Sequence, residues 1–501
     1  MTGESSTVEL ALRSFAGHRE RTALVHGERR VSYGELLDQV YRTARALDRL
    51  AVRPGHMVTL LGGNAPEMVI ARYAANLVGA GVTELYAGMS AESKARIVDD
   101  VETGLLLVHA DFTEESRAVL AQSSPGRVVG LTELLRLAAG ESAEPVQGRA
   151  RPGDVQQIRH TGGTSGHPKG ITYTFGHHLA ALRRMSILRA PASEDRRQLL
   201  CTTIAHAGGG YADGTLASGG TVFLHEHFDA GAVLETIERE RITDIWLLPP
   251  LLYRLVDHPD AAHRDTSSLR SVVYGGCKAN PARLADAVTR FGPVLMQFYG
   301  QTEAGGISAL GKEEHLRPEL LGTAGKPLPG VELAFRDEQG EPVPDGQPGE
   351  LQVRTGMAMD GYWKQPELTA QVLHDGWVRT GDVGFLDAEG YLHLVDRVKD
   401  MIVVVGGHVY GTEVEDVLTE HPGVRSAAVF GLPDPDGAER VTAAVVADEG
   451  VTAEELAELV VRRKGAMYRP ATVFFVPELP LTDTGKPDKK ALRATQLALV
   501  G

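Results

Sequence analysis

The chain is 501 residues long, with a formal net charge of −15 at pH 7 and 43% hydrophobic residues. A single hydrophobic core rarely serves so long a chain, so the length predicts several domains. The acidic balance argues against nucleic acid or an anionic membrane as the main partner. Apolar runs fall short of the ~20 residues that span a bilayer, the polar start does not form a signal peptide, and Cys201 and Cys277 provide no disulfide framework. We therefore expect a cytoplasmic enzyme with no membrane span, present as a monomer or homodimer.

The first 150 residues alternate short apolar runs with helical periods. Ser32 and Glu35 form a capping box, in which each side chain accepts from a backbone N–H at the start of a helix. The helix behind it places Leu36, Val40 and Leu47 on one face. This alternation of strand and helix indicates a parallel sheet covered by helices. The predicted strands are 22–25, 57–61 and 105–108, and further helices are predicted at 66–77 and 91–101.

Residues 151–320 repeat this alternation, whereas residues 321–395 are rich in turns and indicate a β-subdomain. Residues 396–400 hold four charges in five positions, as an exposed linker does. A new alternation begins at residue 401 and has the size of a small α+β domain. The predicted fold is therefore α/β, with a large N-terminal domain of stacked α/β sheets (1–395) that includes the β-subdomain, a hinge (396–400), and a small mobile α+β C-terminal domain (401–501). In the middle segment, the predicted strands are 155–158, 171–174, 198–204, 221–225, 244–248, 271–274 and 294–299.

A stretch rich in glycine and hydroxyl groups occupies residues 161–170, with the sequence T-G-G-T-S-G-H-P-K-G. Glycines let backbone N–H groups approach an anion, hydroxyls add donors, and a lysine adds positive charge. Most stretches of this composition are simple loops. A Walker loop is excluded, because Pro168 and Gly170 flank Lys169 where that motif needs a helix opening and a hydroxyl. The stretch remains a candidate phosphate loop of another type.

Four more segments combine glycine with polar groups, and each alone fits a surface loop. Y-G-Q-T-E at 299–303 joins an aromatic ring that can stack on adenine to a carboxylate that can hold Mg²⁺. T-G-D at 380–382 places an aspartate in a predicted turn, where it could chelate a ribose diol. D-R-V-K-D at 396–400 is the predicted linker, and T-G-K at 484–486 is a turn with a lysine at its tip. The order and spacing of these segments favour a functional interpretation that no single one supports.

In this order, the segments resemble the adenylate-forming superfamily, which includes acyl- and aryl-CoA ligases, adenylation domains of nonribosomal peptide synthetases, and firefly luciferase. The resemblance covers essentially the whole chain and includes V-G-G-H at 405–408. It implies ATP-dependent activation of a carboxylic acid to an acyl-adenylate, release of pyrophosphate, and transfer to CoA as a thioester. The implied cofactors are ATP, Mg²⁺ and coenzyme A, or a carrier-protein phosphopantetheine.

The resemblance also implies roles for individual residues. The β- and γ-phosphates of ATP would be held by Thr161, Gly162, Gly163, Thr164, Ser165, Gly166 and Lys169. Adenosine would be held by Gly275, Gly276, Cys277, Tyr299, Gly300, Asp382 and Arg397. Thr302, Glu303, Lys169 and Lys486 would act on the reacting groups, and Glu303 with Thr164 would hold the metal. Lys399 matches the hinge residue, and Gly406 with Gly407 matches the loop presented to the thiol acceptor. The acid pocket would include His206, Ala207, Gly208, Gly276 and Gly300.

Elementary electrostatics supports these roles independently. ATP and a carboxylate are both anions, so joining them requires cations where their charges meet. Lys486 and Mg²⁺ would supply that charge during adenylation. A lysine in front of the phosphates would obstruct a thiol that attacks the same carbonyl. Two positions of the C-terminal domain, related by rotation at the hinge, resolve that conflict.

The sequence leaves the acid and the acceptor open. Ala207 stands where members that activate α-amino acids carry an aspartate, which argues against that class of substrate. Glycines 208–210 suggest a roomy pocket for an aryl or medium acyl acid. The alternative to a CoA ligase is a stand-alone adenylating enzyme that loads a separate carrier protein or passes the acyl group to another nucleophile. Residues 82–85, Cys277-Lys278 and Gly411 depart from the family's pattern.

Other classes of protein fit less well. A dinucleotide-dependent oxidoreductase needs G-x-G-x-x-G after a strand, and residues 208–214 miss that spacing. H-E-H at 225–227 lacks the H-E-x-x-H spacing of a zinc protease. A non-catalytic binding protein would have no need for the lysine at 486.

Overall fold

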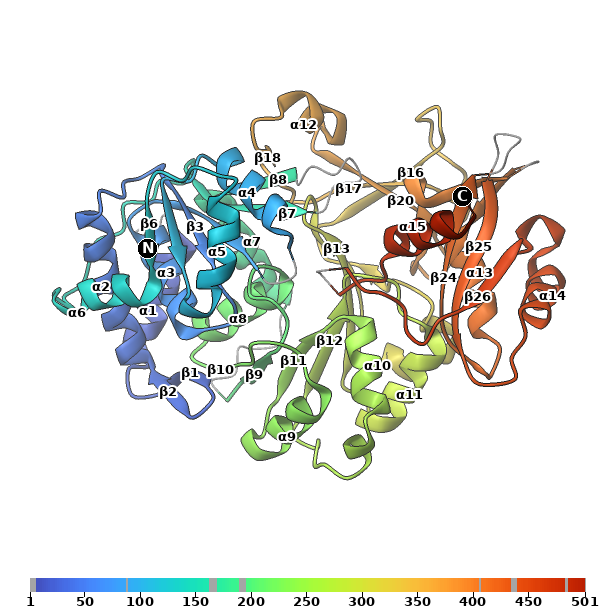
Figure 1. Ribbon diagram of the computed structural model, residues 1–501, viewed down its shortest axis with the longest axis horizontal. Coiled ribbons are helices and arrows are strands. Elements are labelled where there is room, and N and C mark those ends of the chain that lie inside the picture. Colours follow the sequence, from blue (N-terminus) through green and yellow to red (C-terminus); the bar gives the residue numbers. More distant parts are fainter. Residues whose placement is uncertain are drawn as a thin grey trace.

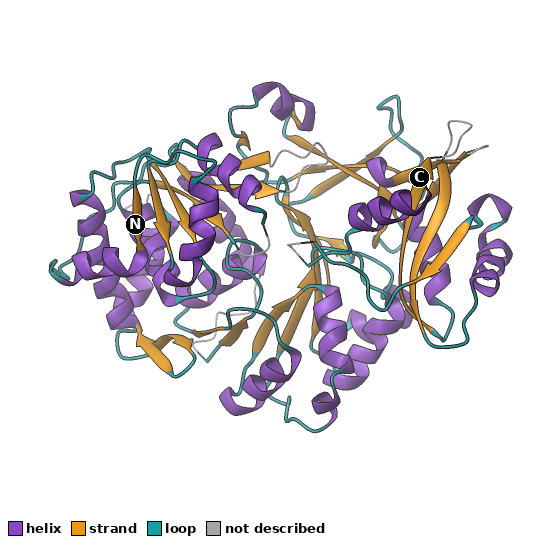
Figure 2. Ribbon diagram, in the orientation of Figure 1, coloured by secondary structure: helices purple, strands orange, loops and turns teal. Residues whose placement is uncertain are grey.

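The structure is a computed structural model, which describes residues 6–86, 89–161, 169–188, 195–404, 407–433, 439–482 and 485–500. Three sheets build the N-terminal part of the molecule, and two small sheets build the C-terminal part (Figure 1). Helices cover the sheets of both parts (Figure 2). The predicted α/β fold with a small α+β C-terminal domain is confirmed.

A seven-stranded sheet, in the order β18-β8-β7-β4-β3-β5-β6, forms the first layer, and β4, β3, β5 and β6 run parallel. Strand β3 shows why helices cover both of its faces. Val58 and Leu60 face a core that they share with α2 and α3, whereas Met57 and Leu61 face a core that they share with α4 and α5. The strands are β3 (Met57–Leu61), β4 (Gly81–Leu85), β5 (Leu105–Val108), β6 (Val128–Gly130), β7 (Val155–Thr161), β8 (Lys169–Thr174) and β18 (Gly361–Tyr362). The helices are α1 (Thr7–Gly17), α2 (Tyr33–Arg49), α3 (Pro66–Leu77), α4 (Ala91–Asp100), α5 (Thr113–Leu120), α6 (Leu131–Ala139) and α7 (Phe175–Leu188).

Local sequence signals explain where the first helices begin. The capping box of α2 is confirmed, because Ser32 accepts from the Glu35 backbone N–H at 3.1 Å and Glu35 accepts from the Ser32 N–H at 2.7 Å. Helix α3 begins with Pro66 at its first position, where a proline costs no backbone hydrogen bond. The bounds predicted for α3, β3 and β5 agree with the structure.

A nine-stranded sheet, in the order β15-β14-β13-β12-β11-β9-β10-β1-β2, forms the second layer. Helices α9, α10 and α11 pack on one face through residues such as Leu247 and Tyr274. Helix α8 contributes Ala212 and Leu216 to the core that this sheet shares with α1, α2 and α3. The strands are β1 (Thr22–His26), β2 (Arg29–Ser32), β9 (Arg197–Leu200), β10 (Thr221–Leu224), β11 (Asp244–Leu247), β12 (Ser271–Gly275), β13 (Leu295–Gln301), β14 (Gly305–Leu310) and β15 (Lys326–Pro327). The helices are α8 (Ala207–Ala217), α9 (Ala230–Glu240), α10 (Pro249–Asp257) and α11 (Pro281–Phe291).

The strand predicted at 198–204 is wrong in its second half, because β9 ends at Leu200. The side chain of Asn64 replaces the missing strand partner. It donates to the carbonyls of Thr202 and His225 at 2.8 Å each, and it accepts from the Ile204 N–H at 2.9 Å. A buried backbone can therefore leave the sheet here without losing its hydrogen bonds.

A five-stranded antiparallel sheet corresponds to the predicted β-subdomain. Residues 380–382 lie within strand β20 of this sheet, so the turn predicted for them is wrong. Gly381 has a φ of +67°, and the Thr380 hydroxyl accepts from the Asp382 N–H at 3.0 Å, which gives the strand a local kink that resembles a turn in sequence. The elements are β16 (Glu332–Arg336), β17 (Gly349–Arg354), β19 (Leu373–His374), β20 (Trp377–Leu386), β21 (Leu392–Arg397) and helix α12 (Pro366–Val372).

The C-terminal part begins where β21 leaves this sheet at Arg397. A two-stranded and a three-stranded sheet pack with two helices around one small core that includes Ile402, Val445 and Leu456. Its strands are β22 (Met401–Val404), β23 (Gly407–Tyr410), β24 (Val424–Pro433), β25 (Glu439–Ala447) and β26 (Thr472–Phe475). Its helices are α13 (Gly411–Thr419), α14 (Ala453–Lys464) and α15 (Lys489–Val500). Short 3₁₀ turns complete the chain at Ala110–Phe112, Pro259–Ala262, Glu314–Leu316, Pro318–Leu320, Val398–Asp400 and Ala466–Tyr468.

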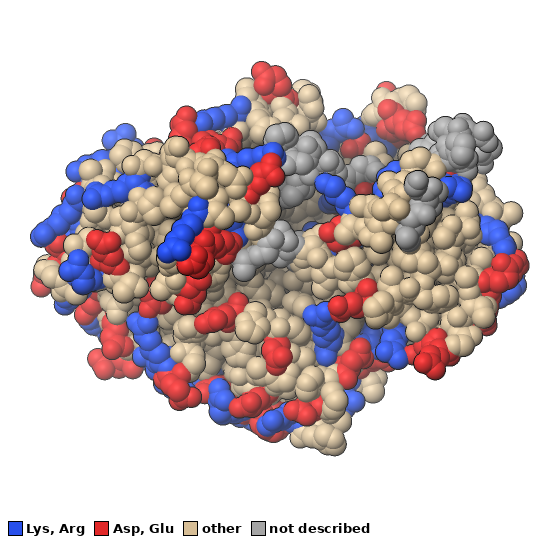
Figure 3. Space-filling view, viewed as in Figure 1, with Lys and Arg blue, Asp and Glu red and all other residues tan. Residues whose placement is uncertain are grey.

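The surface carries both signs of charge. Acidic and basic side chains are interspersed over the face shown in Figure 3. Within the described part of the chain, no helix has the length and apolar character needed to cross a membrane.

Candidate active site

Asp382 is the centre of a hydrogen-bonded cluster that joins the nine-stranded sheet to the five-stranded one. Its Oδ2 accepts from the Tyr299 hydroxyl at 2.5 Å and from Gln301 Nε2 at 2.7 Å. Its Oδ1 accepts from Arg397 Nε at 2.9 Å, because β20 and β21 place these two residues opposite each other. Burial, with the charge of Asp382, raises the pKa of Tyr299 well above its usual value and keeps this hydroxyl a donor. A carboxylate offers about four acceptor positions, so the cluster leaves room for a ligand hydroxyl.

The turn between β13 and β14 carries Thr302 and Glu303. The Tyr362 hydroxyl donates to Glu303 Oε1 at 3.0 Å, and the Tyr173 hydroxyl donates to the Thr302 carbonyl. Lys169 Nζ lies 5.5 Å from the centre of the Tyr362 ring, which brings the first residue of β8 close to this turn. These contacts bring three of the predicted catalytic residues, Lys169, Thr302 and Glu303, into one neighbourhood.

The structure describes the glycine loop only at its two ends. Thr161 at the end of β7 pairs with Lys169 at the start of β8, so the two ends of the loop lie side by side. Gly407 begins β23, and Lys399 lies in a 3₁₀ turn. Gly162, Gly163, Thr164, Ser165, Gly166 and Gly406 lie outside the described residues.

Strand β12 ends at Gly275 beside the strand that carries Tyr299, and Gly276 follows directly. A Cβ atom at Gly275 would lie only 2.2 Å from the Phe298 carbonyl oxygen, so the close approach of the two strands requires glycine. Gly276 has a φ of +90°, and a Cβ atom there would lie 4.0 Å from Lys486 Cε. Burial raises the pKa of the Cys277 thiol to about 12, against an opposing effect of the Lys486 charge. The lysine at the tip of the C-terminal turn therefore lies at the end of β12.

A tight turn holds the backbone of Lys486. The Thr482 N–H donates to the Lys486 carbonyl at 2.7 Å, and the Lys486 N–H donates to the Thr482 hydroxyl at 3.2 Å. Gly485 in this turn has a φ of +81°, which favours glycine. The turn belongs to the C-terminal part, so this placement brings the two parts of the chain together at the site.

Ion pairs between described residues also join the same two parts of the chain. Lys278 Nζ lies 2.7 Å from Asp416 Oδ2 on α13, and Arg254 Nη2 lies 3.3 Å from Glu478 Oε2. Lys278 follows the Gly275–Cys277 segment at a position where the sequence departs from the family's pattern. The departure thus coincides with a contact to the C-terminal part.

His206 precedes α8 and packs edge-on against Tyr86, with ring centres 4.9 Å apart. Its Nε2 is buried and has no hydrogen-bond partner among the residues that the structure describes. Burial lowers the pKa of His206 to about 4, and the charges of Arg159 and Lys486 add to this effect. His206 is therefore a neutral ring that lies within the electrostatic reach of two cations.

The glycines that follow His206 differ in what they face. A Cβ atom at Gly209 would lie 1.8 Å from the Ile204 carbonyl oxygen, and one at Gly208 would lie 2.5 Å from Thr202 Oγ1. Only Gly210 faces open space. The roomy pocket expected at 208–210 is thus confined to Gly210, because the other two glycines allow α8 to approach the 200–204 segment. Ala207 is exposed, and Gly300 lies where a Cβ atom would approach the Gly305 carbonyl to 2.3 Å.

An aromatic cluster that sequence reasoning did not assemble lies beside Gly275. The Tyr211 ring on α8 stacks on Trp246 of β11 at 5.3 Å and meets Phe298 of β13 edge-on at 6.4 Å. Trp246 is one of only three tryptophans in the chain and occupies a strand already predicted from its apolar run. The face of the sheet on which Trp246 lies could have been inferred from the alternation of side chains along that strand. Its contact with α8 could not.

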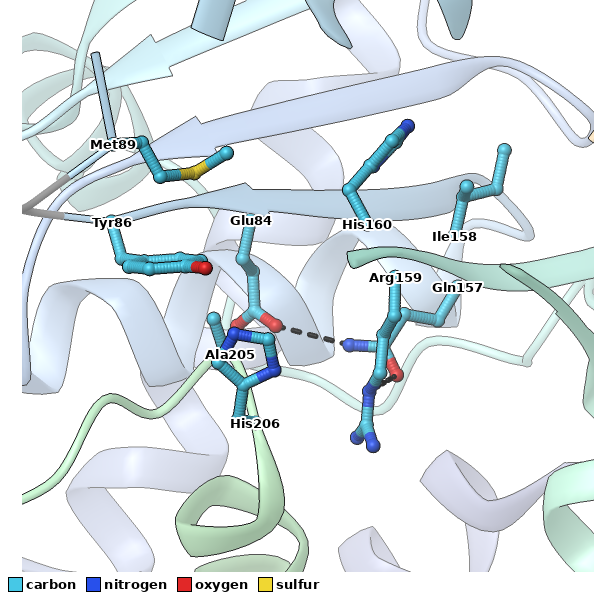
Figure 4. Close-up of a pocket in the computed structure, with 9 residues that line it drawn as sticks. All are labelled: Glu84, Tyr86, Met89, Gln157, Ile158, Arg159, His160, Ala205 and His206. Carbon is cyan, nitrogen blue, oxygen red and sulfur yellow. Dashed lines mark hydrogen bonds between the residues drawn. The ribbon is translucent and has the colours of Figure 1, made fainter. Parts of the chain in front are cut away.

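A small polar pocket lies behind His206 and is shown in Figure 4. Gln157 joins two charged side chains in it. Its Nε2 donates to Glu84 Oε2 at 3.0 Å, and its Oε1 accepts from Arg159 Nε at 2.9 Å. Glu84 lies in the 82–85 segment where the sequence departs from the family's pattern, which is the one signal that pointed here.

Together, these groups lie around the carboxyl ends of the parallel strands β12 and β13, the usual place for a ligand in an open α/β sheet. The aspartate cluster, Glu303 in the neighbourhood of Lys169, and Lys486 from the C-terminal part are the arrangement expected of an adenylate-forming enzyme. The family described as AMP-binding enzyme matches residues 12–363, and its C-terminal domain matches residues 413–486. The chain belongs to this family.

Characterised relatives and solved structures match nearly the whole chain. A medium/long-chain-fatty-acid–CoA ligase of Mycobacterium tuberculosis is 37% identical over 95% of this chain and 88% of its own length. A feruloyl-CoA synthase of an Amycolatopsis species is 36% identical over 93% of this chain and 94% of its own length. The structure of the amide bond synthetase McbA from Marinactinospora thermotolerans superposes with a TM-score of 0.91 and 39% identity, covering 98% of this chain and 99% of that one.

Proposed function

We propose that the protein joins an aryl or medium acyl carboxylic acid to ATP, releases pyrophosphate, and transfers the acyl group from the adenylate to coenzyme A. The position of Lys486 carries this proposal. Its side chain reaches the end of β12 from the C-terminal part of the chain and acts electrostatically on both His206 and Cys277. A cation delivered to the place where two anions must meet is what acyl-adenylate formation requires.

The other residues divide the first half-reaction between them. Asp382 and Arg397 hold the ribose, Tyr299 lies along the adenine, and Lys169 with the glycine loop holds the β- and γ-phosphates. Lys486 then lies between the substrate carboxylate and the α-phosphate. As a carboxylate oxygen attacks the α-phosphorus, the bond to the β-phosphate oxygen breaks, and pyrophosphate leaves with the electron pair. Lys486 stabilises the negative charge that accumulates along this line.

Glu303 fits a role as the protein's magnesium ligand. Its Oε1 accepts from Tyr362, whereas no other described residue donates to its Oε2. A carboxylate oxygen without a donor suits Mg²⁺, which prefers oxygen ligands and keeps contacts to substrate phosphates. Thr164 is the second ligand that we propose. The metal would neutralise phosphate charge during attack on the α-phosphate.

For the second half-reaction, we propose a rotation of residues 401–501 at the 396–400 hinge. The movement withdraws Lys486 and brings the Gly406–Gly407 loop to the site, with Lys399 at the pivot. The contacts that must break support this proposal, because the ion pairs found between the two parts, Lys278–Asp416 and Arg254–Glu478, have partly exposed side chains. Such pairs are individually weak, so the two parts can separate at modest cost.

The class of acid follows from the aromatic cluster and from the relatives. The rings of Tyr211, Trp246 and Phe298 favour an aromatic or extended apolar body. Curated relatives act on a fatty acid, ferulate and indoleacetate, as their names state. The neutral His206 beside Ala207 provides no carboxylate for an α-ammonium group.

An amine acceptor is the second candidate. A structure that matches 98% of this chain at 39% identity is that of an amide bond synthetase. Amide formation would need the same adenylate and the same Lys486, so the first half-reaction does not distinguish the two functions. A separate carrier protein is the remaining acceptor for a thioester.

One experiment tests both half-reactions. Pyrophosphate release is measured with ATP, Mg²⁺ and a panel of aryl and medium acyl acids, and the products are then identified by mass spectrometry after addition of CoA, a phosphopantetheine-bearing carrier protein, or amines. We expect pyrophosphate release with an aryl or medium acyl acid and a CoA thioester as the product. Amides without thioester would establish the second candidate, and no pyrophosphate release with any acid would refute adenylation itself.

A further inference from the structure

Tyr362 on β18 contacts both the proposed metal ligand and a proposed phosphate-binding residue, although none of the steps described above uses it. Its hydroxyl donates to Glu303 Oε1 at 3.0 Å, and Lys169 Nζ lies 5.5 Å from the centre of its ring. Glu303 and Lys169 belong to different sheets, because the first follows β13 and the second begins β8. Tyr362 is therefore a side chain that links the two sheets at the ATP site.

The short strand β18 fixes Tyr362 beside β8, with which it pairs. The Tyr362 backbone N–H donates to the Thr369 hydroxyl at 2.9 Å. The next residue, Trp363, donates its N–H to the carbonyl of Gly170 at 2.7 Å, directly after Lys169. The Tyr362 ring and the Lys169 side chain are thus placed by the same pair of strands.

The segment 359–362 also holds Glu303, by its backbone and by its side chain. The Met359 N–H donates to the Glu303 carbonyl at 2.8 Å, and the Tyr362 hydroxyl donates to the Glu303 carboxylate. The Tyr173 hydroxyl of β8 donates to the neighbouring carbonyl of Thr302. Of these three contacts, the one made by Tyr362 reaches the side chain of Glu303 and can orient it.

Packing explains the ring of Tyr362 but not its hydroxyl. The side chain is 7% exposed and packs in a small core with Ile171, Tyr173 and Met359. A phenylalanine would place the same ring in this core. The hydroxyl of a buried tyrosine needs a partner, and here the partner is one oxygen of a carboxylate, which only accepts. The other oxygen of Glu303, to which no described residue donates, is left for a metal.

We propose that Tyr362 is a positioning residue for the ATP site, in which its hydroxyl orients the Glu303 carboxylate for Mg²⁺ and its ring holds the Lys169 ammonium for the β- and γ-phosphates. A tyrosine does both at once, because its hydroxyl donates from the edge of the ring whereas a cation is attracted to the face. One side chain thus sets the separation between the metal ligand and the phosphate-binding cation. This inference rests on the proposed function and adds to it a residue that acts through two others.

A second tyrosine makes the same kind of contacts among residues that none of the proposed steps uses. The Tyr391 hydroxyl donates to Glu314 Oε1 at 2.9 Å, and Lys326 Nζ lies 4.5 Å from the centre of the Tyr391 ring. The Tyr391 side chain is 3% exposed, so it is as buried as the first tyrosine. Loss of its hydroxyl has a comparable structural cost, which makes Tyr391→Phe the matched control.

The test measures the binding of metal and nucleotide without turnover. Mn²⁺ is the metal probe, because it is paramagnetic and takes the same oxygen ligands as Mg²⁺. Its affinity is measured by EPR titration of the protein saturated with α,β-methylene-ATP, which cannot lose pyrophosphate. The affinity for the metal-free analogue is measured by calorimetry in the presence of EDTA. The first affinity reports on Glu303 and the second on Lys169.

Two variants separate the hydroxyl from the ring. Tyr362→Phe should weaken Mn²⁺ binding about tenfold, as loss of a hydrogen bond to a charged group allows, and should change the affinity for the metal-free analogue by less than about twofold. Tyr362→Leu also removes the ring and should weaken the metal-free analogue about two- to fivefold, the effect of a lost cation–π contact. Where the leucine variant does not fold, the metal affinity of Tyr362→Phe decides the proposal.

Kinetics provides a readout that a merely structural role would not change. In Tyr362→Phe, the Mg²⁺ concentration for half-maximal pyrophosphate release should rise about tenfold, whereas the rate at saturating Mg²⁺ should stay within about twofold of wild type. Combination of Tyr362→Phe with Glu303→Gln should weaken Mn²⁺ binding no further than Glu303→Gln alone, because the hydroxyl acts through that carboxylate.

The control Tyr391→Phe should leave both affinities unchanged. An unchanged Mn²⁺ affinity in Tyr362→Phe would overturn the proposal, as would an equal loss in Tyr391→Phe, or losses that add when Tyr362→Phe is combined with Glu303→Gln. Pyrophosphate release by the wild-type protein with any acid would still uphold adenylation in each of these cases, so failure of the positioning role and failure of the function are distinguishable.

Discussion

The nucleotide side and the acid side of this active site differ in how completely the protein satisfies its own polar groups. On the nucleotide side, Asp382 accepts from Tyr299, Gln301 and Arg397. On the acid side, His206 Nε2 is buried, and no described residue forms a hydrogen bond with it. The first region is held together by its own hydrogen bonds, whereas the second contains a buried polar atom without a partner among the described residues.

This difference corresponds to what each side must recognise. Adenosine is the same in every reaction of the family, so a cluster fixed by its own hydrogen bonds can be preorganised for it. The acid differs between members, and groups left unsatisfied at the acid side are the ones that a particular substrate would satisfy. Lys486 lies between the two regions, so changes to it should affect both.

Replacement of the lysine between the two sides should have the largest effect. We expect Lys486→Ala to reduce acyl-adenylate formation about 10²–10³-fold or more, because it removes the cation at the point where two anions meet. Transfer from chemically prepared acyl-adenylate should be nearly unaffected, since the rotation that we propose removes Lys486 from the site before that step. Pyrophosphate release and single-turnover transfer measure the two separately.

Lys490→Ala is the matched control for this variant, because Lys490 is an exposed lysine of the same terminal segment. It should retain normal rates in both half-reactions. Equal losses in both half-reactions of Lys486→Ala would contradict the role assigned to this lysine.

Replacement of Asp382 on the nucleotide side should have the next largest effect. Asp382→Asn keeps the shape of the side chain but removes the charge that Arg397 and Tyr299 share, so we expect the KM for ATP to rise about 10–100-fold, as charge-assisted hydrogen bonds allow. The KM for the acid should change little, because the acid side is built from other elements. Steady-state kinetics with each substrate varied in turn measures this contrast.

Asp387→Asn in the same hairpin is the control. Asp387 accepts from His393 Nε2 at 2.8 Å and lies outside the cluster. A KM for ATP that rises as much in this variant would show that the effect is structural rather than local to the nucleotide.

The sequence predicted the nucleotide side far better than the acid side, for a physical reason. Tyr299, Asp382 and Arg397 lie in short motifs whose order identifies the superfamily, and their contacts follow from strand pairing. Arg159, Glu84 and Gln157 come from two strands whose side chains meet only through the register of β4 and β7. No local sequence pattern predicts that these side chains contact one another.

The dependence on contacts between residues far apart in sequence also explains the errors in the predicted elements. Helix α3 and strand β3 were predicted to the residue because capping, proline and periodicity act locally. The early end of β9 depends on Asn64, more than 130 residues away in sequence. Helix α8, with three consecutive glycines near its start, has no helical signal of its own, and its position depends on close packing against residues 200–204.

The unsatisfied histidine of the acid side should make stability depend on pH. The pKa of His206 is lowered to about 4, whereas an unfolded histidine titrates near 6.5. The unfolded chain therefore binds the proton first as pH falls, so the stability that His206 contributes is fully present above about pH 6.5 and decreases toward pH 4. We expect a decrease of roughly 3 kcal/mol from this group by pH 4.

Thermal or urea unfolding of wild type and His206→Gln between pH 7 and pH 4 measures this effect. The variant should lose this part of the pH dependence. His374→Gln, at a histidine whose side chain is 79% exposed, should not lose it. Parallel stability curves for wild type and His206→Gln would rule out a buried neutral imidazole.

The smallest effect should come from the contacts that hold the two parts of the chain together for adenylation. Lys278 and Asp416 form an exposed pair at 2.7 Å, worth at most about 1 kcal/mol. Asp416→Lys should therefore slow adenylation only about two- to fivefold at low salt, and the difference should disappear at high salt as the charges are screened. Lys278→Asp combined with Asp416→Lys should restore the rate by reversing the pair.

Glu413→Lys, which breaks the Lys464–Glu413 pair within the C-terminal part, is the control and should leave the salt dependence unchanged. A charge reversal that fails to restore adenylation would show that Lys486 is positioned by the tight turn at Thr482 and not by this pair.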